Sequence, residues 1–371
     1  MASGHRFTGM RGIATVPSYV ILQPTTLCNL DCTYCYLPLR AENRRMPVEV
    51  AQATARTVNR WAAQSGRFSV VWHGGEPLAA GRVRLAELMA PFTGVEHHLQ
   101  TNATLIDDEW CDFFHTHEVH IGLSVDGPRR LTAQRVDRGG REAYNQIMEG
   151  ARTLRRHGIA FAALCVVSDP TPRLARELYP FFLELGCYAL GINIEEREGV
   201  NTRSNAYAEE AVRGFWAELT AAWRAQPDIE LRDVEFAIRY LSAARRDEAD
   251  TILPRQLDPI PTIAYDGSVV LLSPELAGFT SPQYGDFSAG DVRTTPLDEI
   301  VDGATGARWV GEYLRGVEAC RESCAYFGFC GGGHAANRYF EHGRFDGTVT
   351  EHCRNSKIRL MEGVLDHAAP R

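Results

Sequence analysis

Short continuous apolar runs recur along the first half of the chain, and longer amphipathic stretches separate them. A short apolar run bounded by turn residues indicates a buried strand, and apolar residues three to four positions apart indicate a helix. The runs predict six strands, at Tyr19–Gln23, Ser69–His73, His97–Thr101, His120–Val125, Ile159–Val167 and Tyr188–Ile194. The stretches between and after them predict helices, at Val48–Gln64, Asp107–His117, Glu142–His157, Pro172–Leu185, Ala206–Ala225 and Arg232–Arg246.

Strands that are apolar throughout, rather than alternating, are typical of a parallel sheet covered by helices. We therefore predict an α/β fold whose core is a (β/α)₆ partial TIM barrel. In such a barrel the active site is built from residues that directly follow the strands. The polar residues after each predicted strand are thus the first candidates for chemistry.

The pattern changes at about residue 247, where short strands and turns replace the long helices. The segment Ile263–Leu272 around Asp266-Gly267 predicts a hairpin. We expect three parts: an N-terminal arm over residues 1–17, the barrel over 18–235, and a smaller α+β domain over 236–371.

Charge and cysteine content narrow the class of protein. The chain has 371 residues, 39 basic and 47 acidic, and a net charge of −8, which disfavours nucleic acid as a partner. The N-terminus lacks the apolar stretch of a secretion signal, and no apolar run approaches the ~18 residues of a transmembrane helix. We therefore expect a cytoplasmic protein with no membrane partner. Its ten cysteines then indicate metal binding or catalysis rather than disulfides.

Cys28, Cys32 and Cys35 lie together directly after the first predicted strand. This spacing would arise by chance in about 1% of chains of this composition. Three thiolates with His73 would suit a zinc site of the Cys₃His type. They would equally suit a [4Fe–4S] cluster in which one iron stays open for a ligand.

The spacing Cys-x₃-Cys-x₂-Cys, with Tyr34 before the third cysteine, resembles the signature of the radical SAM superfamily. The resemblance implies that the three cysteines hold a [4Fe–4S] cluster that cleaves S-adenosylmethionine to a 5′-deoxyadenosyl radical. It also implies an external electron donor, a reducing flavodoxin or a ferredoxin-type protein.

Motifs after later strands extend this resemblance along the barrel. Gly74-Gly75-Glu76-Pro77 resembles the family's GGEP motif, Thr101-Asn102 its TN motif, and the segment Ser124–Pro128 its SxDGP motif. Each would otherwise be an ordinary turn or strand-end cap. By the resemblance, the residues that contact S-adenosylmethionine are Tyr34, Gly74, Gly75, Glu76, Pro77, Thr101, Asn102, Ser124, Asp126 and Arg135, and Arg135 pairs bidentately with its carboxylate.

A second cysteine cluster, formed by Cys320, Cys324, Cys330 and Cys353, lies in the C-terminal part. Four thiolates can close a structural zinc site completely. The segment also resembles the SPASM and twitch domains of radical SAM proteins, which carry auxiliary [4Fe–4S] clusters. Because the stretch Leu272–Leu276 has no cysteine where related proteins have one, we predict a single auxiliary cluster held by these four residues.

Residues 330–353 resemble the C-terminal segment of cyclophane-forming peptide maturases, although His334 departs from that pattern. The resemblance implies a precursor peptide as substrate, abstraction of a Cβ hydrogen, and a crosslink from an aromatic carbon to that Cβ. The auxiliary cluster would take the remaining electron. Glu195, Glu275 and Asp286 are the candidate catalytic bases for the remaining proton.

Other functions stay open at this point. The peptide could instead be oxidised to formylglycine, as in sulfatase maturases, or modified by epimerisation or thioether formation. A different class would be a non-enzymatic zinc or electron-transfer protein. The N-terminal arm is too short for a leader-binding domain, so we expect the barrel rim, the C-terminal domain or a partner protein to recognise a leader.

Overall fold

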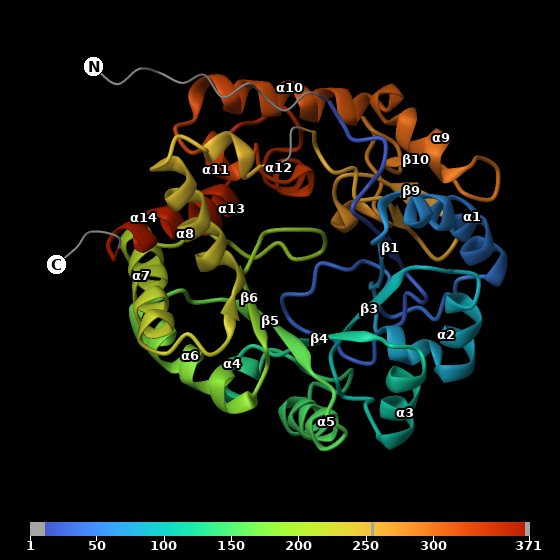
Figure 1. Ribbon diagram of the computed structural model, residues 1–371, viewed down its shortest axis with the longest axis horizontal. Helices are drawn as coiled ribbons and strands as arrows, with labels where there is room; N and C mark the ends of the chain where they lie inside the picture. The colour runs from blue at the N-terminus through green and yellow to red at the C-terminus, as the bar shows by residue number, and fades with distance from the viewer. Residues whose placement is uncertain (1–11, 254–255, 368–371) are drawn as a thin grey trace.

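The computed structural model describes residues 12–253 and 256–367. Its central element is an incomplete barrel of parallel strands with helices around the outside (Figure 1). The strands that follow one another around the barrel are β1 (Tyr19–Leu22), β2 (Ser69–Trp72), β3 (Glu96–Thr101), β4 (His120–Ser124), β5 (Phe161–Val167), β6 (Ala189–Ile194) and the short β7 (Glu230–Leu231). The predicted α/β partial barrel is confirmed, and each predicted strand lies within two residues of its expected bounds.

The outer layer consists of helices that connect these strands (Figure 1). They are α1 (Val48–Ser65), α2 (Arg82–Met89), α3 (Asp108–Thr116), α4 (Arg129–Thr132), α5 (Tyr144–Arg156), α6 (Pro172–Leu185), α7 (Glu209–Ala225) and α8 (Arg232–Ala244). Helices α2 and α4 and strand β7 were not predicted, because each is too short to show a clear apolar period.

Local sequence signals set the helix ends. The Asp107 side chain accepts a hydrogen bond from the backbone of Trp110 at 2.8 Å and begins α3. Thr171 caps α6 in the same way, with Pro172 at the first helical position. Gly186 ends α6 in the left-handed conformation that glycine adopts without strain. These caps fix where α3 begins and where α6 begins and ends.

The sheet runs β10-β9-β8-β1-β2-β3-β4-β5-β6-β7, and β1 to β7 are all parallel. The predicted hairpin is confirmed as β8 (Thr262–Ile263) and β9 (Ser268–Val270), followed by β10 (Ser288–Asp291). Strand β8 pairs in parallel with β1, so the C-terminal part extends the barrel sheet at its β1 edge. The boundary between residues 235 and 236 remains a prediction.

The remaining C-terminal elements run across the top of Figure 1 and down its left side to α7. Besides short turns, they are α9 (Leu297–Asp302), α10 (Arg308–Ser323), α11 (Phe327–Cys330), α12 (Ala335–His342), α13 (Glu351–Cys353) and α14 (Arg359–Leu365). Helix α14 packs closely on α7, where a side chain at Gly363 would collide with Trp216. The two cysteine clusters are thereby joined within one packed structure. Most of the predicted N-terminal arm, residues 1–11, lies outside the described residues.

None of the described helices is long and apolar enough to cross a membrane.

Candidate active site

The three-cysteine loop follows β1 and lines a cavity of about 400 Å³ at the C-terminal ends of the strands. Backbone hydrogen bonds hold this loop, with Cys28 N donating to Arg40 O at 2.9 Å and Glu76 N donating to Leu27 O at 2.8 Å. Gly75 passes so close that a β carbon there would lie 2.6 Å from Thr25 O and 2.7 Å from Leu27 O. A glycine is therefore required where this turn meets the cysteine loop.

All three cysteines line the same cavity and none forms a disulfide. Burial raises the pKa of Cys28 to about 12 and that of Cys32 to about 11, so these thiols would ionise only on binding a metal. Three converging thiols with no fourth cysteine fit a [4Fe–4S] cluster with one open iron. His73 also lines the cavity, and its Nε2 lies 3.1 Å from the hydroxyl of Tyr36.

Glu76 joins the ends of β2 and β3 beside the cysteine loop. Its carboxylate is 1% exposed and accepts hydrogen bonds from Thr101 Oγ1 and Asn102 N, both at 2.8 Å, and from Leu78 N at 3.1 Å. Burial raises the pKa of Glu76 to about 7, although these three hydrogen bonds oppose the rise. The motifs at Glu76 and at Thr101-Asn102 therefore form one network.

Of the ten residues expected to contact S-adenosylmethionine, seven line the cavity: Tyr34, Gly75, Glu76, Thr101, Asn102, Ser124 and Arg135. Gly74, Pro77 and Asp126 are not among the lining residues. Pro77 begins a short 3₁₀ helix, Pro77–Ala80, and Gly74 has a positive φ of 89° in the preceding turn. These two residues shape the turn that presents Gly75 and Glu76.

Asp126 and Arg135 form a buried pair at the cavity wall, where only Arg135 lines the cavity. Arg135 donates from Nε to Oδ2 of Asp126 at 2.9 Å and from Nη2 to Oδ1 at 2.8 Å. Tyr34 donates its hydroxyl hydrogen to the same carboxylate at 2.6 Å. In this structure the bidentate partner of Arg135 is Asp126, and the expected pairing with a ligand carboxylate stays a prediction. Asp126 holds Arg135 and Tyr34 in place rather than lining the cavity.

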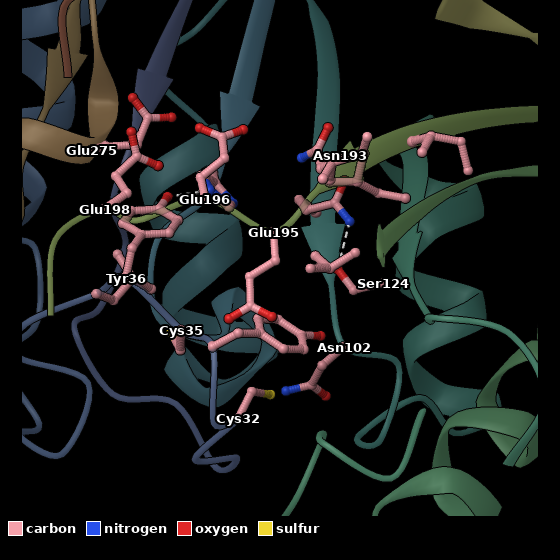
Figure 2. Close-up of a pocket in the computed structure, with 18 of the residues that line it drawn as sticks. Cys32, Cys35, Tyr36, Asn102, Ser124, Asn193, Glu195, Glu196, Glu198 and Glu275 are labelled. Atoms are coloured by element: carbon pink, nitrogen blue, oxygen red, sulfur yellow. Dashed lines mark hydrogen bonds between the residues drawn. The ribbon is translucent and has the colours of Figure 1, made fainter. Parts of the chain in front are cut away.

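Carboxylates from two distant segments gather on another wall of the cavity. Glu195, Glu196 and Glu198 follow β6, and Glu275 lies on the short helix Pro274–Leu276. Figure 2 shows Glu198 and Glu275 next to Tyr36, with Glu195 reaching towards the cysteine loop. Burial and the nearby Glu196 raise the pKa of Glu275 to about 7. Burial and the neighbouring Glu275 likewise raise the pKa of Glu198 well above its ordinary value.

Two of the three predicted catalytic bases therefore lie at the cavity. Glu195 is buried, and its Oε2 has no hydrogen-bond partner among the described residues. Asp286 is a wrong prediction for a base at this site: it is exposed, does not line the cavity, and accepts a hydrogen bond from Ser288 N at 3.0 Å. Glu198 was missed, since an acidic residue in a loop carries no signal of its own.

The second cysteine cluster lines a separate cavity of about 220 Å³. Cys320 lies in the last turn of α10, Cys330 ends α11 and Cys353 lies in α13, with Cys324 between the first two helices. Four cysteine side chains around one cavity fit a closed four-thiolate site, as predicted for an auxiliary cluster. Gly331, Gly332 and Gly333 after Cys330 all have positive φ, which explains the run of glycines there.

His334 lies between the two cavities and lines both of them. It is the residue at which the sequence departs from the expected pattern, and the sequence alone did not reveal its position. Its ring lies 5.0 Å from that of His352, measured between ring centroids. The Nδ1 atom of His352 in turn lies 3.0 Å from Oε1 of Glu196. The main cavity thus reaches directly to the wall of the four-cysteine cavity.

The profile of the radical SAM superfamily matches residues 22–195, the segment that carries the three cysteines and the motifs around them. The chain belongs to the radical SAM superfamily. It is accordingly a radical SAM enzyme, with a [4Fe–4S] cluster and S-adenosylmethionine as cofactors. Cys28, Cys32 and Cys35 stay the predicted ligands of that cluster.

Several relatives of this radical SAM enzyme are similar in sequence. Uncharacterized protein sll1766 of Synechocystis is 32% identical, covering 93% of this chain and 90% of that protein. The serine-type anaerobic sulfatase-maturating enzyme of Bacteroides thetaiotaomicron is 30% identical over 46% of this chain and 45% of its own length. The cysteine-type enzyme of Clostridium perfringens is 32% identical over 45% of this chain and 49% of its own length. The match thus spans about half of each of these two maturases.

Two solved structures share the fold over most of the chain. The structure of anSMEcpe with bound AdoMet has a TM-score of 0.73 and 21% identity, covering 94% of this chain and 97% of that one. Streptococcus suis SuiB bound to precursor peptide SuiA has a TM-score of 0.62 and 16% identity, covering 91% and 76%. Both likenesses include the C-terminal part as well as the barrel.

Proposed function

We propose that this radical SAM enzyme oxidises a residue of a peptide substrate at its β carbon. The observation that carries the proposal is the position of His334, which lines both the main cavity and the four-cysteine cavity. A substrate in the main cavity would touch the three-cysteine loop on one side and lie close to the second cluster on the other. Peptide-bound structures of anSMEcpe and SuiB support a peptide as the substrate class.

When bound, the first cluster with S-adenosylmethionine supplies a hydrogen-abstracting radical, and the second cluster supplies an electron acceptor. The chain's own residues would keep water from the radical and accept the proton. Leu164, Val166 and Ile192 form an apolar stretch of the cavity wall that keeps water from a carbon radical. Loss of one hydrogen atom, one electron and one proton oxidises the substrate by two electrons overall.

Glu275 is the base that we propose for the proton. It lines the cavity, and its pKa of about 7 matches the pH at which a carboxylate is an effective general base. Glu195 also lines the cavity, but Arg203 Nε lies 3.3 Å from its Oε1 and Asn201 Nδ2 donates to the same oxygen at 3.1 Å. These partners favour a fixed Glu195 that positions substrate.

Formylglycine is the first product that we propose, because the named relatives that match the barrel are serine-type and cysteine-type anaerobic sulfatase-maturating enzymes. In that reaction the β carbon, after losing its hydrogen atom, gives up an electron, and its oxygen or sulfur gives up a proton. The product is a carbonyl group from serine or a thiocarbonyl group from cysteine. Thiocarbonyl hydrolysis would then complete the cysteine reaction.

A crosslink between an aromatic carbon and a β carbon is the second candidate. Two features favour it: the C-terminal part has four cysteines that line one cavity, and residues 330–353 resemble cyclophane-forming maturases. In this reaction the carbon radical adds to an arene, and the proton and electron leave on rearomatisation. The same cavity, base and acceptor would serve both reactions.

Mass spectrometry after anaerobic co-expression tests the proposal. We would co-express the enzyme with a short peptide encoded beside it and, separately, with serine and cysteine sulfatase peptides. Loss of two hydrogens with reactivity towards a hydrazide indicates formylglycine from serine, and the same loss without that reactivity indicates a crosslink. An unmodified mass for every peptide, with 5′-deoxyadenosine still released, would contradict peptide oxidation. A variant with Cys28, Cys32 and Cys35 changed to alanine is the matched inactive control.

A further inference from the structure

Arg338, on α12, is a charged side chain enclosed completely by the C-terminal part. It is 1% exposed. Arginine is almost never buried to this extent without a negative partner, because removing its charge from water costs several kcal/mol. Among residues 12–253 and 256–367, however, no carboxylate lies within ion-pair distance of Arg338. Its compensating charge must come from another kind of group.

The contacts of Arg338 identify that group. Nη1 donates to the carbonyl oxygens of Tyr313 at 3.3 Å and Phe345 at 3.0 Å, and Nη2 donates to the carbonyl oxygen of Gly332. Nη2 also lies 3.3 Å from Sγ of Cys320. The carbonyls are neutral, so the sulfur of a cluster ligand is the one contacted atom that can carry a full negative charge.

The surrounding chain is shaped around this side chain. A β carbon at Gly316 on α10 would collide with Nη1 of Arg338 and lie 2.8 Å from Phe345 O. Gly332 has a φ of 108°, which turns its carbonyl towards the guanidinium and which an L side chain rarely adopts. Two glycines, one on α10 and one beside Cys330, therefore make room for the cation and bind it.

We propose that Arg338 is the counter-cation of the C-terminal iron–sulfur cluster and raises the reduction potential of that cluster. The inference rests on the auxiliary cluster of the proposed function. A cluster with four thiolate ligands is negatively charged, and its negative charge grows by one on reduction. A fixed cation that donates a hydrogen bond to a ligand sulfur stabilises the reduced form more than the oxidised form. Arg338 would thus enable the cluster to take the substrate's electron.

Redox titration followed by EPR tests this role in the full-length enzyme with reconstituted clusters. Arg338→Gln should lower the potential of the C-terminal cluster, and Arg338→Lys should lower it less because the charge remains. The three-cysteine cluster of the same molecule is an internal reference whose potential should not move. Arg344→Gln, which changes an exposed arginine six residues away, is the matched control.

An unchanged potential in Arg338→Gln at full iron content would overturn the inference. If Arg338→Gln fails to load the second cluster while Arg338→Lys loads it, the charge is needed for assembly. A lowered potential in the lysine variant then supports the inference, and a parental potential overturns it. A parent enzyme with only about four irons per chain would overturn the auxiliary cluster itself, together with this inference. The iron count therefore separates failure of the proposed function from failure of the role of Arg338.

A second and independent observation concerns the opposite end of the barrel. Glu96 and His98 lie on the same face of β3, and the register of the sheet pairs His98 with His120 at the start of β4. The two imidazole rings stack with their centroids 4.7 Å apart. Two histidines and a glutamate are thus gathered by adjacent strands, far from either cysteine cluster along the strands.

One ligand atom from each of these three side chains lies within 4.8 Å of the others. The Nε2 atom of His98 is buried, lies 3.7 Å from Oε2 of Glu96, and has no hydrogen-bond partner in the described part of the chain. Arg67 contacts the Glu96 carboxylate at 3.1 Å, but its side chain is 80% exposed. Two imidazoles and one carboxylate are a donor set of zinc sites.

We infer that Glu96, His98 and His120 form a site for a divalent transition metal. Calorimetric titration of zinc into the holoenzyme, whose cysteines are occupied by clusters, tests it. A joint change of His98→Ala and His120→Ala should abolish one zinc site, and Arg67→Ala should tighten binding by freeing Glu96. The joint change of His115→Ala and His117→Ala, on the neighbouring surface, is the matched control. Equal zinc binding by the two double variants, or no binding by the parent, would overturn the site.

Discussion

Arg135, which lines the main cavity, and Asp126, which lies behind it, form a buried bidentate ion pair with two N–O distances of 2.8 and 2.9 Å. Their side chains are 8% and 2% exposed. Asp126 also accepts a hydrogen bond from Val166 N at 3.0 Å, so the pair connects the end of β4 to β5. A pair this deep is costly to break, because the remaining charge is left without water or partner.

Asp126→Asn should therefore destabilise the fold by about 3–5 kcal/mol, which thermal unfolding of the holoenzyme would show as a large fall in Tm. Glu142→Gln is the matched control, since it breaks the exposed pair with Arg129 and should cost at most about 1 kcal/mol. Equal effects of the two changes would show that burial of the Asp126–Arg135 pair has no energetic consequence.

Glu76→Gln should weaken S-adenosylmethionine binding and lower stability by about 1–3 kcal/mol. An amide has one acceptor oxygen, so it cannot replace a carboxylate that accepts from Thr101, Asn102 and Leu78 together. Equilibrium dialysis with S-adenosylmethionine and thermal unfolding would measure the two effects. Thr101→Val, which removes only one of these hydrogen bonds, should have a smaller effect on both. A Glu76→Gln variant with parental affinity would contradict a role for this network in the cavity.

Iron analysis should find about eight irons per chain in the reconstituted enzyme, in two clusters. Changing Cys28, Cys32 and Cys35 to alanine should remove about half of the iron and all release of 5′-deoxyadenosine. Changing Cys320, Cys324, Cys330 and Cys353 to alanine should also remove about half, but should leave some S-adenosylmethionine cleavage. The matched control changes Cys111 and Cys187, which line neither cavity, and should keep all of the iron. Zinc in place of iron in the second site would contradict an auxiliary iron–sulfur cluster.

Glu275→Gln should reduce product formation by about 100-fold or more and leave S-adenosylmethionine cleavage in place, because only the proton acceptor is lost. In the parent enzyme, product formation should rise as the pH increases through about 7, where Glu275 ionises. The rise should be absent in Glu275→Gln. Asp286→Asn, at an exposed acidic residue outside the cavity, is the control and should behave as the parent. A parental rate in Glu275→Gln would exclude it as the base.

The raised pKa of Glu275 also affects the stability of the folded protein. Burial raises the pKa of Glu275 from 4.5 to about 7, so between these values the folded protein holds a proton that the unfolded chain has released. The contribution of this group to stability should therefore fall as the pH rises from about 4.5 to about 7. Thermal unfolding of the parent and of Glu275→Gln across this range would show a difference that changes with pH. A constant difference would indicate that Glu275 is ionised throughout.

The barrel could be predicted in outline because several of its strands, such as β1, β5 and β6, are short, largely buried apolar runs between turn residues. The three-cysteine loop could be predicted because its ligands lie within eight residues of one another. The cofactor motifs after β2, β3 and β4 followed from the rule that strand ends meet at one face. These features are local in sequence, or repeat with a period that a single chain displays.

The carboxylate wall could not be predicted in full. Glu198 and Glu275 are separated by more than seventy residues. Packing between distant segments brings the C-terminal part to the cavity, through the pairing of β8 with β1 and the contact of His352 with Glu196. For the same reason Asp286, which is acidic and close to Glu275 in sequence, was a wrong prediction: the chain turns away before it. The position of His334 between the two cavities likewise depends on how α12 packs and not on neighbouring residues.

The sequence by itself therefore determined the class of fold, both sets of cysteines, and the motifs around the first set, because covalent spacing and apolar period are enough to specify them. The tertiary structure decided which side chains from distant segments lie next to one another. It paired Arg135 with Asp126 and placed four glutamates on one wall of the main cavity. It also placed His334 between the cavities and enclosed Arg338 against Cys320. The physical reason is that burial and charge compensation depend on which segments pack together, and packing between distant segments leaves no mark in the local pattern of the chain.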